Sequence, residues 1–564
     1  MQLRKMEEAD ESVNSPAPNL PLGVSGSARN VGDLCYDLLS RYGLLSLLLL
    51  LALVFARSVC GSQQKALWND EIYSVIVATQ PTWHKFAQAM PSECNPPLYP
   101  LLARLAIRLF GLTDLSVRMP DILSFLAALA GVYVFVRREC GVVFGLLAVV
   151  LIFSEPGWTY SFEARPYGLL LAFLMLALVS WQSAANAAEA TPRRPRRLAL
   201  VGIVIGIVGS IFSHGIGVVE VGVPLLFGEA VRLHRTRRPD WPILATALSA
   251  SPALAIILPM MRRTRDLLLI YSRAEMHPLT LAKLHQYWIV NPKSTLNLIL
   301  NPALIEILAT IVFVAWAPRW LNCSGSNSSD RLDQGLIVRP SAHAIAAALG
   351  ASLLIPATML AMMSSTGYYN CRYGIGSIAG IAMLACLLIG RAGRRQSTIC
   401  LSLFAFLLLS YTHGYISAMR HPPGQADAVA YVLSSDQSDL PIVISDPFNY
   451  IRVWWYAPAS VKDRFIYLSD EPTGIQHDYL VPEVALVAEK PLISARLEDY
   501  AGFLSTHDHF LLDTDADDRS IFLKARLEGA GYRSTLQADD GFNHLYDMQR
   551  TASTSKINRV KTNR

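Results

Sequence analysis

The sequence predicts a polytopic α-helical membrane protein with a smaller α/β domain at its C-terminal end. Of its 564 residues, 52% are hydrophobic and only 16% are charged, and the mean hydropathy is +0.32. Soluble globular proteins carry about 25% charged residues. Apolar stretches of about 18–20 residues, the length that crosses a bilayer, recur through the first three quarters of the chain. This composition excludes a disordered chain, a collagen-like fibre and an ordinary cytosolic enzyme.

About eleven transmembrane helices are expected from the length of the apolar stretches. They are Tyr42–Cys60, Arg118–Val136, Gly141–Ser154, Pro166–Ala185, Leu198–Ser213, Gly217–Val231, Trp241–Met261, Ala303–Ala317, Ala342–Met363, Tyr373–Gly390 and Ser397–Tyr411. The stretch Pro97–Phe110 is also apolar, but it carries Arg104 and Arg108 one helical turn apart. We therefore expect it to form an interfacial helix rather than a further span.

The distribution of lysine and arginine predicts the orientation in the membrane. The basic clusters fall in alternate connections, on one side of the predicted helices: Arg137–Arg138, Arg193–Arg197, Arg232–Arg238, Arg319–Arg339 and Arg391–Arg395. We expect that side, and the polar segment 1–41, to be cytoplasmic in a multi-pass protein of the cell (inner) membrane. An odd number of crossings then places the C-terminal domain outside.

The chain divides into a membrane module over residues 42–415 and an extracytoplasmic α/β domain over residues 416–550. Two long outer loops, 61–116 and 262–302, interrupt the membrane module. Hydrophobic alternation in the C-terminal domain predicts strands and helices, namely helices at Ala426–Ser434 and Ser520–Gly529, strands at Pro441–Ser445, Phe465–Ser469 and His509–Asp513, and a hairpin of Tyr532–Gln537 with His544–Met548. The polar tail 551–564 is expected to be disordered.

An acidic pair, Asp70-Glu71, follows directly after the first predicted span. Two adjacent carboxylates at a membrane surface cost desolvation energy unless water, a cation or a ligand compensates their charge. A carboxylate just outside the bilayer could accept the proton of a substrate hydroxyl, as a general base does. The alternative for this pair is a solvated turn.

Further polar residues lie at the same predicted face. Asn95 and Tyr99 border a Pro-Pro pair that begins the interfacial helix, since proline is tolerated at a helix start, or that forms a simple turn. Glu163 and Arg165 lie in a later outer connection, where, taken alone, they would pair with each other. Other polar residues of this face are His214, which ends a span, and Arg372 with its neighbour Tyr373.

Three arginines lie on the predicted outer side, although lysine and arginine are expected to gather on the cytoplasmic side. Arg262, Arg263 and Arg265 begin the second outer loop, where positive residues should be scarce. Arginine binds phosphate through its planar fork, so these residues indicate either a phosphorylated ligand or anionic lipid. Together with the carboxylates and the histidine, they predict a site for a phosphorylated lipid headgroup at the outer helix ends.

Several of these motifs occur together in one known superfamily. The chain contains, in order, NDEIYS from Asn69, NPPLYPLL from Asn95, FGLTDLSVRMP from Phe110 and FEARPYGLLLAF from Phe162. This order resembles the GT-C integral membrane glycosyltransferases, and within them the dolichyl-phosphate-mannose–protein mannosyltransferase and aminoarabinose transferase group. The resemblance extends over residues 66–218. It implies transfer of a sugar from a polyprenyl-phosphate donor to a glycan, lipid or protein acceptor on the extracytoplasmic face.

The resemblance also implies roles for individual residues. Asp70 matches the acidic residue of the first loop and is expected to be the general base, Glu71 completes the pair, and Glu163 matches a second acidic residue. Arg372 matches an arginine expected to contact phosphate. Asn95 departs from the pattern, because aminoarabinose transferases carry a lysine there, and this favours a neutral hexose such as mannose.

The sequence thus predicts an inverting hexosyltransferase that acts in the membrane and binds no nucleic acid. The expected catalytic residues are Asp70, Glu71 and Glu163, and the expected donor-binding residues are Asn95, Tyr99, Arg165, His214, Arg262, Arg263, Arg265, Arg372 and Tyr373. No cofactor is required by the motifs; a carboxylate-rich site could hold a divalent metal, but no ligand spacing demands one. The sequence also leaves open a disulfide between Cys94 and Cys371.

A lipid-linked sugar flippase or transporter is the alternative function. Transporters typically show internal repeats and broken helices near the middle of the membrane. Here the ionisable residues gather at the outer helix ends and no repeat is evident, which favours the enzyme.

Overall fold

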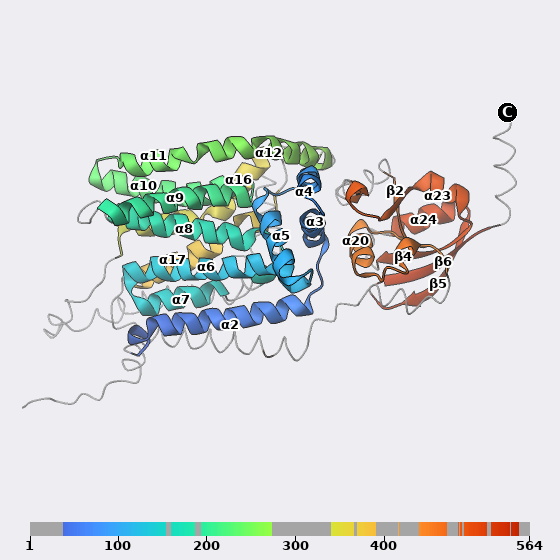
Figure 1. The fold of residues 1–564 in the computed structure, drawn as a ribbon, viewed down its shortest axis with the longest axis horizontal. Helices are drawn as coiled ribbons and strands as arrows, with labels where there is room; N and C mark the ends of the chain where they lie inside the picture. Colours follow the sequence, from blue (N-terminus) through green and yellow to red (C-terminus); the bar gives the residue numbers. More distant parts are fainter. Residues whose placement is uncertain are drawn as a thin grey trace, which may run out of the picture.

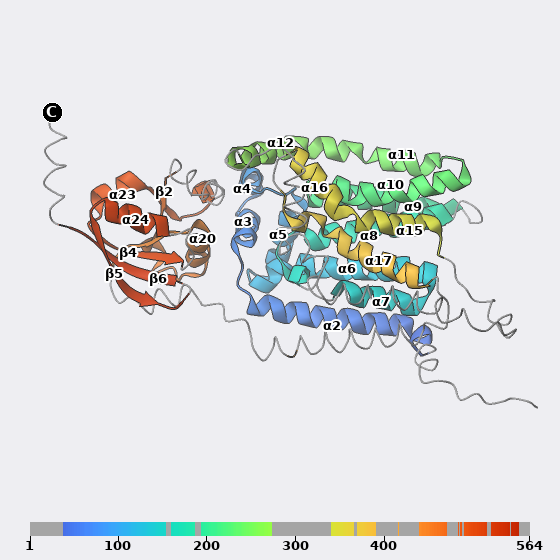
Figure 2. The same cartoon turned by 180° about the vertical axis from the view of Figure 1, so that it is seen from behind.

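The computed structural model confirms the predicted class, a helical membrane protein with a C-terminal α/β region (Figures 1 and 2). The structure describes the following residues: 38–153, 159–186, 193–272, 340–365, 369–390, 416, 439–470, 483, 486, 487, 490–515, 521–541 and 543–551. The predicted helices Ala303–Ala317, Ser397–Tyr411 and Ala426–Ser434 lie outside these residues, as do segment 1–37 and tail 552–564. The side chain of Cys371 also lies outside the described residues, so a disulfide between Cys94 and Cys371 stays a prediction.

Five described helices, or six if one bent pair is counted as a single span, are long and apolar enough to cross a membrane. They are α2 (Gly43–Gln64), α6 (Asp114–Cys140), α8 (Tyr167–Asn186), α9 (Arg193–Ser213), the continuous pair α11 (Trp241–Ser249) and α12 (Ser251–Ser272), and the bent pair α15 (Ala342–Ser352) and α16 (Leu354–Ser365). Three further helices complete the described bundle: α7 (Val142–Phe153), α10 (Gly217–Thr236) and α17 (Gly376–Gly390). A count of about eleven spans remains a prediction.

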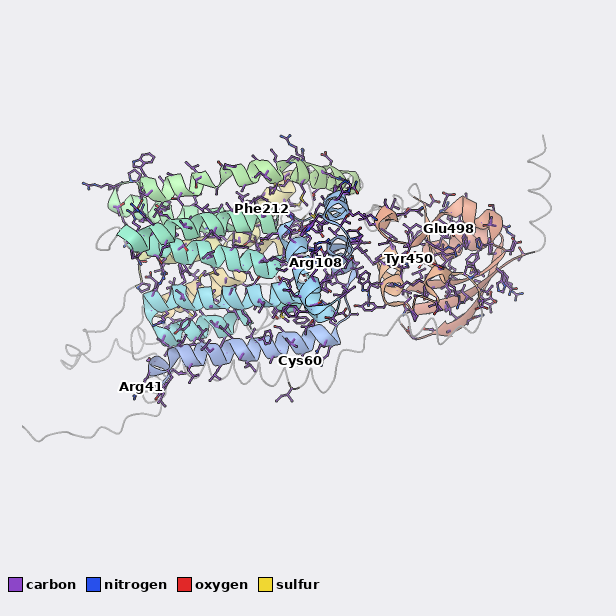
Figure 3. All side chains as sticks on the ribbon, viewed as in Figure 1. Arg41, Cys60, Arg108, Phe212, Tyr450 and Glu498 are labelled. Carbon is purple, nitrogen blue, oxygen red and sulfur yellow. The ribbon has the colours of Figure 1, made fainter. Side chains whose placement is uncertain are left out.

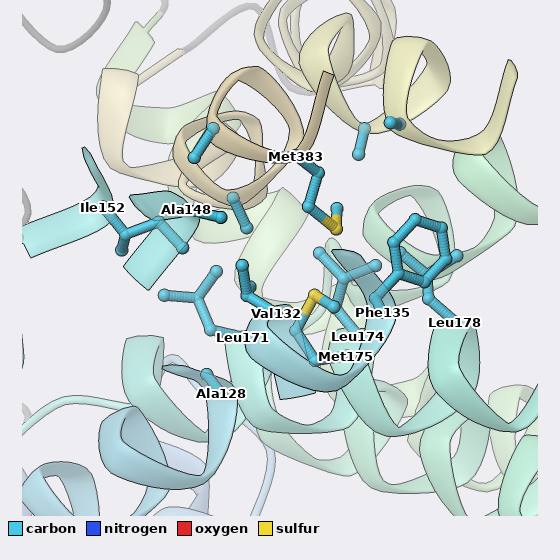
Figure 4. Packing of buried hydrophobic residues seen from close by; sticks show 14 of the residues in the cluster. Ala128, Val132, Phe135, Ala148, Ile152, Leu171, Leu174, Met175, Leu178 and Met383 are labelled. Carbon is cyan, nitrogen blue, oxygen red and sulfur yellow. The ribbon is translucent and has the colours of Figure 1, made fainter. Parts of the chain in front are cut away.

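The helices run side by side and bury a common apolar core (Figures 1 and 4). At its centre, Val132 of α6 lies among Leu171 and Met175 of α8 and Met383 of α17, and all four side chains are almost fully buried. Helices α6 and α8 approach closely because small residues face the contact. Gly168, at the start of α8, lies so close to Asp121 of α6 that a Cβ atom would come within 2.5 Å of the Asp121 carbonyl oxygen.

Short helices cover the end of the bundle that faces the C-terminal domain (Figure 1). They are α3 (Asn69–Ala78), α4 (Trp83–Ala89), the 3-10 helix η1 (Met90–Ser92) and α5 (Leu98–Phe110). Helix α5 has 13 residues and is absent from the described helices that could span a membrane. Arg104 of α5 is buried and donates hydrogen bonds to the carbonyl oxygens of Ala78, the last residue of α3, and of Gln80, two residues later. Its charge therefore joins α5 to the C-terminal end of α3, where the helix dipole favours a cation.

The positive clusters of α6, α9 and α10 lie at the opposite ends of these helices from α3–α5. Arg137 and Arg138 fall in the last turn of α6, Arg193 begins α9, and Arg235 falls in the last turn of α10. In Figure 3, Arg41 marks that end of the bundle, and Cys60 lies farther along α2, toward the C-terminal domain.

The C-terminal region forms a six-stranded sheet with the strand order β3-β2-β1-β4-β6-β5. Its strands are β1 (Ile442–Ile444), β2 (Phe465–Ser469), β3 (Arg496–Asp499), β4 (His509–Asp515), β5 (Tyr532–Asp539) and β6 (Asn543–Arg550). The pairs among β3, β2, β1 and β4 are parallel, whereas β6 pairs antiparallel with both β4 and β5. The helices are α20 (Pro447–Tyr456), α23 (Tyr500–Thr506) and α24 (Ile521–Gly529). The predicted strands, hairpin and helix α24 are found, whereas α20, α23 and β3 were not predicted.

Replacing Gly168 by alanine should push α8 away from α6, because the added methyl group meets the Asp121 backbone. We expect a loss of about 1–3 kcal/mol in unfolding free energy, as for overpacked cores. Thermal unfolding of the purified protein in detergent measures this loss. Gly222→Ala is the matched control, since a Cβ at Gly222 meets no atom within 4 Å. Equal unfolding temperatures for the two variants would contradict the close helix contact.

Candidate active site

Helix α3 carries the acidic pair and is built around Glu71. The backbone N–H of Trp68, the residue that caps α3, donates to the Glu71 carboxylate at 3.1 Å. Acidic side chains in a first turn also suit the positive end of the helix dipole. The pair therefore lies in a helix, and the alternative of a solvated turn is wrong, since Glu71 is completely buried.

Arg118 of α6 fixes the position of α3. An arginine side chain has five N–H donors, and here all five are used. Nε and Nη2 donate to the two oxygens of Glu71 at 2.8 and 2.6 Å, and the remaining donors reach the carbonyl oxygens of Ser62, Lys65 and Ala66 at 2.6–3.1 Å. Both charged side chains have zero exposure. The end of α2, the start of α3 and the outer part of α6 are thus held by one guanidinium.

Glu71 is saturated by these contacts, which gives it a positioning role. Its Oε1 also accepts the backbone N–H of Ala164, from the connection before α8. A carboxylate that is buried and accepts from four protein donors cannot reach a substrate hydroxyl. We therefore assign Glu71 a positioning role in the site. The sequence predicted that Glu71 is a catalytic residue, and its buried contacts do not support that role.

Asp70, the neighbour of Glu71, points to a different environment. Its side chain is 29% exposed, and one oxygen lies 3.7 Å from a guanidinium nitrogen of Arg165 and 3.7 Å from one of Arg372. The other oxygen accepts from the Asn69 amide at 3.2 Å. At 3.7 Å the two arginines attract the carboxylate without forming hydrogen bonds. The Asp70 carboxylate is accessible and its contacts with both arginines are loose, whereas the Asp70 backbone carbonyl oxygen accepts a hydrogen bond from Nη1 of Arg165 at 3.2 Å.

Arg165 is held by a second carboxylate, Glu93, which lies 3.8 Å away and was not a predicted site residue. Glu93 is buried and accepts hydrogen bonds from the Ser74 hydroxyl at 2.7 Å and from the Asn95 amide at 3.0 Å. Burial lowers the pKa of Arg165, but Asp70 and Glu93 outweigh it, so the pKa lies above its usual value. Arg165 therefore stays charged at any physiological pH, and Asn95 supports it through Glu93.

Glu163 pairs with Lys65, 3.3 Å away at the end of α2. The expected Glu163–Arg165 pair is wrong, because Arg165 instead faces Asp70 and Glu93 and each partner comes from a distant part of the chain. Burial raises the pKa of Glu163, and Lys65 opposes that rise. Its Oε2 atom is buried and has no hydrogen-bond partner among the described residues.

Arg372 lies in the 3-10 helix η7 (Cys371–Gly374), beside an aromatic ring. Its guanidinium lies 4.8 Å from the centre of the Trp68 ring. His214 packs between Tyr167 and Tyr373, with ring centres 6.0 and 5.4 Å away. Burial lowers the pKa of His214 to about 3, helped by Arg165 and Arg372. The imidazole is therefore neutral, so it can offer a hydrogen bond but no positive charge to a phosphate.

The remaining predicted residues lie outside this cluster. The Tyr99 hydroxyl donates to the carbonyl oxygen of Val117 at 2.8 Å and joins α5 to α6, which is a packing role. Helix α12 continues through Arg262, Arg263 and Arg265, so these residues lie on a helix and not in a loop. They are exposed, and in the described part of the chain no ion pair joins them to Asp70. The described residues also contain no group of three or more His, Cys, Asp or Glu side chains that could hold a metal.

The structure therefore brings together six charged side chains at one end of the bundle: Lys65, Asp70, Glu93, Glu163, Arg165 and Arg372. Sequence analysis missed Lys65, Glu93 and the anchor Arg118. Arg118 belongs to the motif FGLTDLSVRMP, so its presence was noted, but nothing in the motif indicates its partner. The spacing of Glu93 from Arg165 likewise carries no signal in a single sequence.

Replacing Glu71 by glutamine should strongly destabilise the protein. The glutamine amide carries no charge, so the buried Arg118 loses its ion-pair partner. The NH₂ group of the amide also faces N–H donors that bind the carboxylate of Glu71. Breaking one side of a buried ion pair costs about 3–5 kcal/mol. The control is Glu498→Gln, which breaks a partly exposed pair with Arg496 and should cost about 0–1 kcal/mol. Thermal unfolding in detergent compares them, and equal shifts would exclude the anchoring role.

The chain is similar to known proteins in sequence over part of its length and in overall fold. Residues 94–260 match the sequence model of the dolichyl-phosphate-mannose-protein mannosyltransferase family. No curated protein matches the chain. The crystal structure of ArnT from Cupriavidus metallidurans bound to undecaprenyl phosphate is 13% identical with a TM-score of 0.52, and the apo form is 12% identical with a TM-score of 0.51. Each alignment covers 89% of this chain and 97% of the ArnT chain. The predicted resemblance is confirmed: residues 94–260 match the mannosyltransferase family model, and the fold is similar to that of ArnT.

Proposed function

We propose that this chain transfers a sugar from a polyprenyl-phosphate donor to an acceptor hydroxyl, with Asp70 as the general base. The observation that carries the proposal is the position of Asp70 between Arg165 and Arg372, partly exposed and loosely held. The similarity to ArnT, one structure of which is bound to undecaprenyl phosphate, supports a polyprenyl-phosphate donor and a site open to membrane lipid.

The donor phosphate would bind to Arg165 and Arg372. Burial lowers the pKa of Arg372, but the negative charges around it, with Asp70 among them, raise it above the usual value, so both arginines are permanently charged. Arg372 uses Nε for Asn370 and Nη1 for the loose contact with Asp70, and its Nη2 donates to no protein group among the described residues. A planar guanidinium with a free edge suits bidentate binding of phosphate. Arg262, Arg263 and Arg265, exposed on α12, would then contact lipid headgroups.

The sugar would lie between Trp68 and Glu163. The indole N–H of Trp68 and the Oε2 atom of Glu163 are buried, and neither has a hydrogen-bond partner among the described residues. Sugar hydroxyls both donate and accept hydrogen bonds, so one ring could satisfy both atoms. A neutral hexose such as mannose fits the role of Asn95, whose amide is occupied by Glu93, and we propose a hexose as the sugar.

The reaction would be a single displacement. The acceptor oxygen attacks the anomeric carbon and gives its proton to Asp70, while the bond from that carbon to the phosphate oxygen breaks on the opposite face. The anomeric configuration is therefore inverted. The leaving phosphate carries its negative charge to Arg165 and Arg372, so no protein acid has to protonate it.

We propose that this end of the bundle faces the extracytoplasmic side. The basic residues Arg137, Arg138, Arg193 and Arg235 lie at the other ends of their helices. Positive residues in short connections mark the cytoplasmic side. The acceptor would then reach Asp70 from outside the cell.

Replacing Asp70 by asparagine should leave the protein folded but reduce sugar release from radiolabelled undecaprenyl-phosphate mannose by about 10²–10⁴-fold, the usual contribution of a general base. Asp508→Asn is the control, because Asp508 is exposed in the C-terminal domain. Release at the wild-type rate by the Asp70 variant would remove Asp70 from the mechanism. Movement of the intact lipid across vesicles by a wild-type protein that releases no sugar would favour the flippase.

Replacing Arg372 by glutamine should raise KM for the same donor about 10-fold or more, because a charged contact to phosphate is lost. Glutamine keeps some of the length of the side chain but carries no charge. Arg533→Gln, an exposed arginine of β5, should leave KM unchanged. An unchanged KM for the Arg372 variant would place the phosphate elsewhere. Preferential cleavage of undecaprenyl-phosphate aminoarabinose by the wild type would overturn the hexose assignment.

A further inference from the structure

Helix α3 has two faces with different partners. At 100° per residue, Asp70 and Ser74 share one face, and both contact Arg165. Ile72, Val75 and Ile76 lie on the opposite face and are almost fully buried. The same apolar cluster includes residues of α20 and of strands β1 and β2 in the C-terminal domain. Helix α3 therefore separates the charged cluster from the C-terminal domain.

Helix α20 of the C-terminal domain contacts α3 (Figure 1). Its last residue, Tyr456, makes two polar contacts there. The backbone N–H of Leu67 donates to the Tyr456 hydroxyl at 2.7 Å, and that hydroxyl donates to Asp114 at 2.9 Å. Leu67 directly precedes the residue that caps α3, and Asp114 begins α6. One hydroxyl of the C-terminal domain thus links the start of α3 to the helix that carries Arg118.

The peptide unit between Ala66 and Leu67 is held from both sides. Its carbonyl oxygen accepts from Nη2 of Arg118 at 3.1 Å, and its N–H donates to Tyr456. This peptide unit lies four residues before Asp70, at the point where the chain leaves α2 and turns into α3. Its plane therefore sets the direction in which α3 begins, and with it the position of the Asp70 carboxylate.

We propose that Tyr456 is a positioning residue and that the C-terminal domain, through it, is part of the catalytic unit. The proposal rests on the function proposed above and names what orients its base. The domain holds the Ala66–Leu67 peptide unit so that Asp70 faces the acceptor hydroxyl. Placement of a base matters steeply, since a shift of about 1 Å caused far from the chemistry can cost 10²-fold in rate.

The test compares two Tyr→Phe changes on α20 in the full-length protein. Tyr456→Phe removes the hydroxyl that holds Leu67 and Asp114. Tyr450→Phe removes a hydroxyl that donates to the carbonyl oxygen of Arg496, within the C-terminal domain. Two quantities are measured: the kinetics of sugar release from radiolabelled undecaprenyl-phosphate mannose, and the hydrogen exchange of the peptide that contains Leu67.

We expect Tyr456→Phe to lower kcat about 10-fold or more, to leave the donor KM within about twofold, and to speed exchange at Leu67. Tyr450→Phe should change none of the three. A wild-type kcat for Tyr456→Phe, or equal losses in both variants, would overturn the proposal, since the second result would indicate general loss of domain stability.

Failure of the proposed function is distinguishable from failure of this inference. If wild-type protein releases no sugar from any polyprenyl-phosphate donor, the proposed function fails. The hydrogen-exchange measurement still tests whether the Tyr456 hydroxyl holds the backbone N–H of Leu67. Unchanged exchange at Leu67 in Tyr456→Phe would overturn the positioning role whatever the activity.

Discussion

The buried ion pair between Arg118 and Glu71 is the interaction on which the rest of the site depends. Desolvating two opposite charges is costly, and a buried pair gains stability only when its remaining donors and acceptors are satisfied. Here every N–H group of Arg118 donates a hydrogen bond, and each carboxylate oxygen of Glu71 accepts two. The pair joins the end of α2 and the start of α3 to α6 and to the connection before α8, which both come much later in the sequence. Its effect is to select one geometry for the helix that carries Asp70.

The charged groups of the site divide into tight and loose contacts. The Arg118–Glu71 contact measures 2.6 Å, whereas the Asp70 carboxylate lies 3.7 Å from the nearest guanidinium nitrogen of Arg165 and of Arg372. A phosphate that binds Arg165 and Arg372 with hydrogen bonds would therefore replace weak contacts and leave the tight ones intact. Electrostatic stabilisation of this kind is effective because the donors are already in place before the charge develops. The free-energy cost of ordering these donors is met when the helix ends fold, before any phosphate binds.

Sequence patterns predicted the parts of this protein that depend on local periodicity. Strand β2 and helix α24 could be predicted because a short apolar run and an amphipathic stretch are local signals. Helix α3 could not, since Ile72, Val75, Ile76 and Val77 favour strands by intrinsic preference and tertiary packing decides the outcome. The same limit applies to the site. The gathering of acidic and basic residues at one end of the helices was predictable. The choice of partners among Glu163, Arg165 and Lys65 was not, because it depends on distances between remote segments.

If the chain transfers a sugar as proposed, the position of α3 between the charged cluster and the C-terminal domain affects how the two substrates meet. The lipid tail of a donor must stay beside the apolar helices, because each exposed methylene costs about 0.8 kcal/mol. Its phosphate would then reach Arg165 and Arg372 from the side of the bundle. An acceptor that is soluble or extends outside the membrane must approach past α3 and the domain docked on it. The C-terminal domain would then both orient Asp70 and restrict which acceptors reach it. These two effects are separable, because the first acts on the start of α3 and the second on the approach of the acceptor.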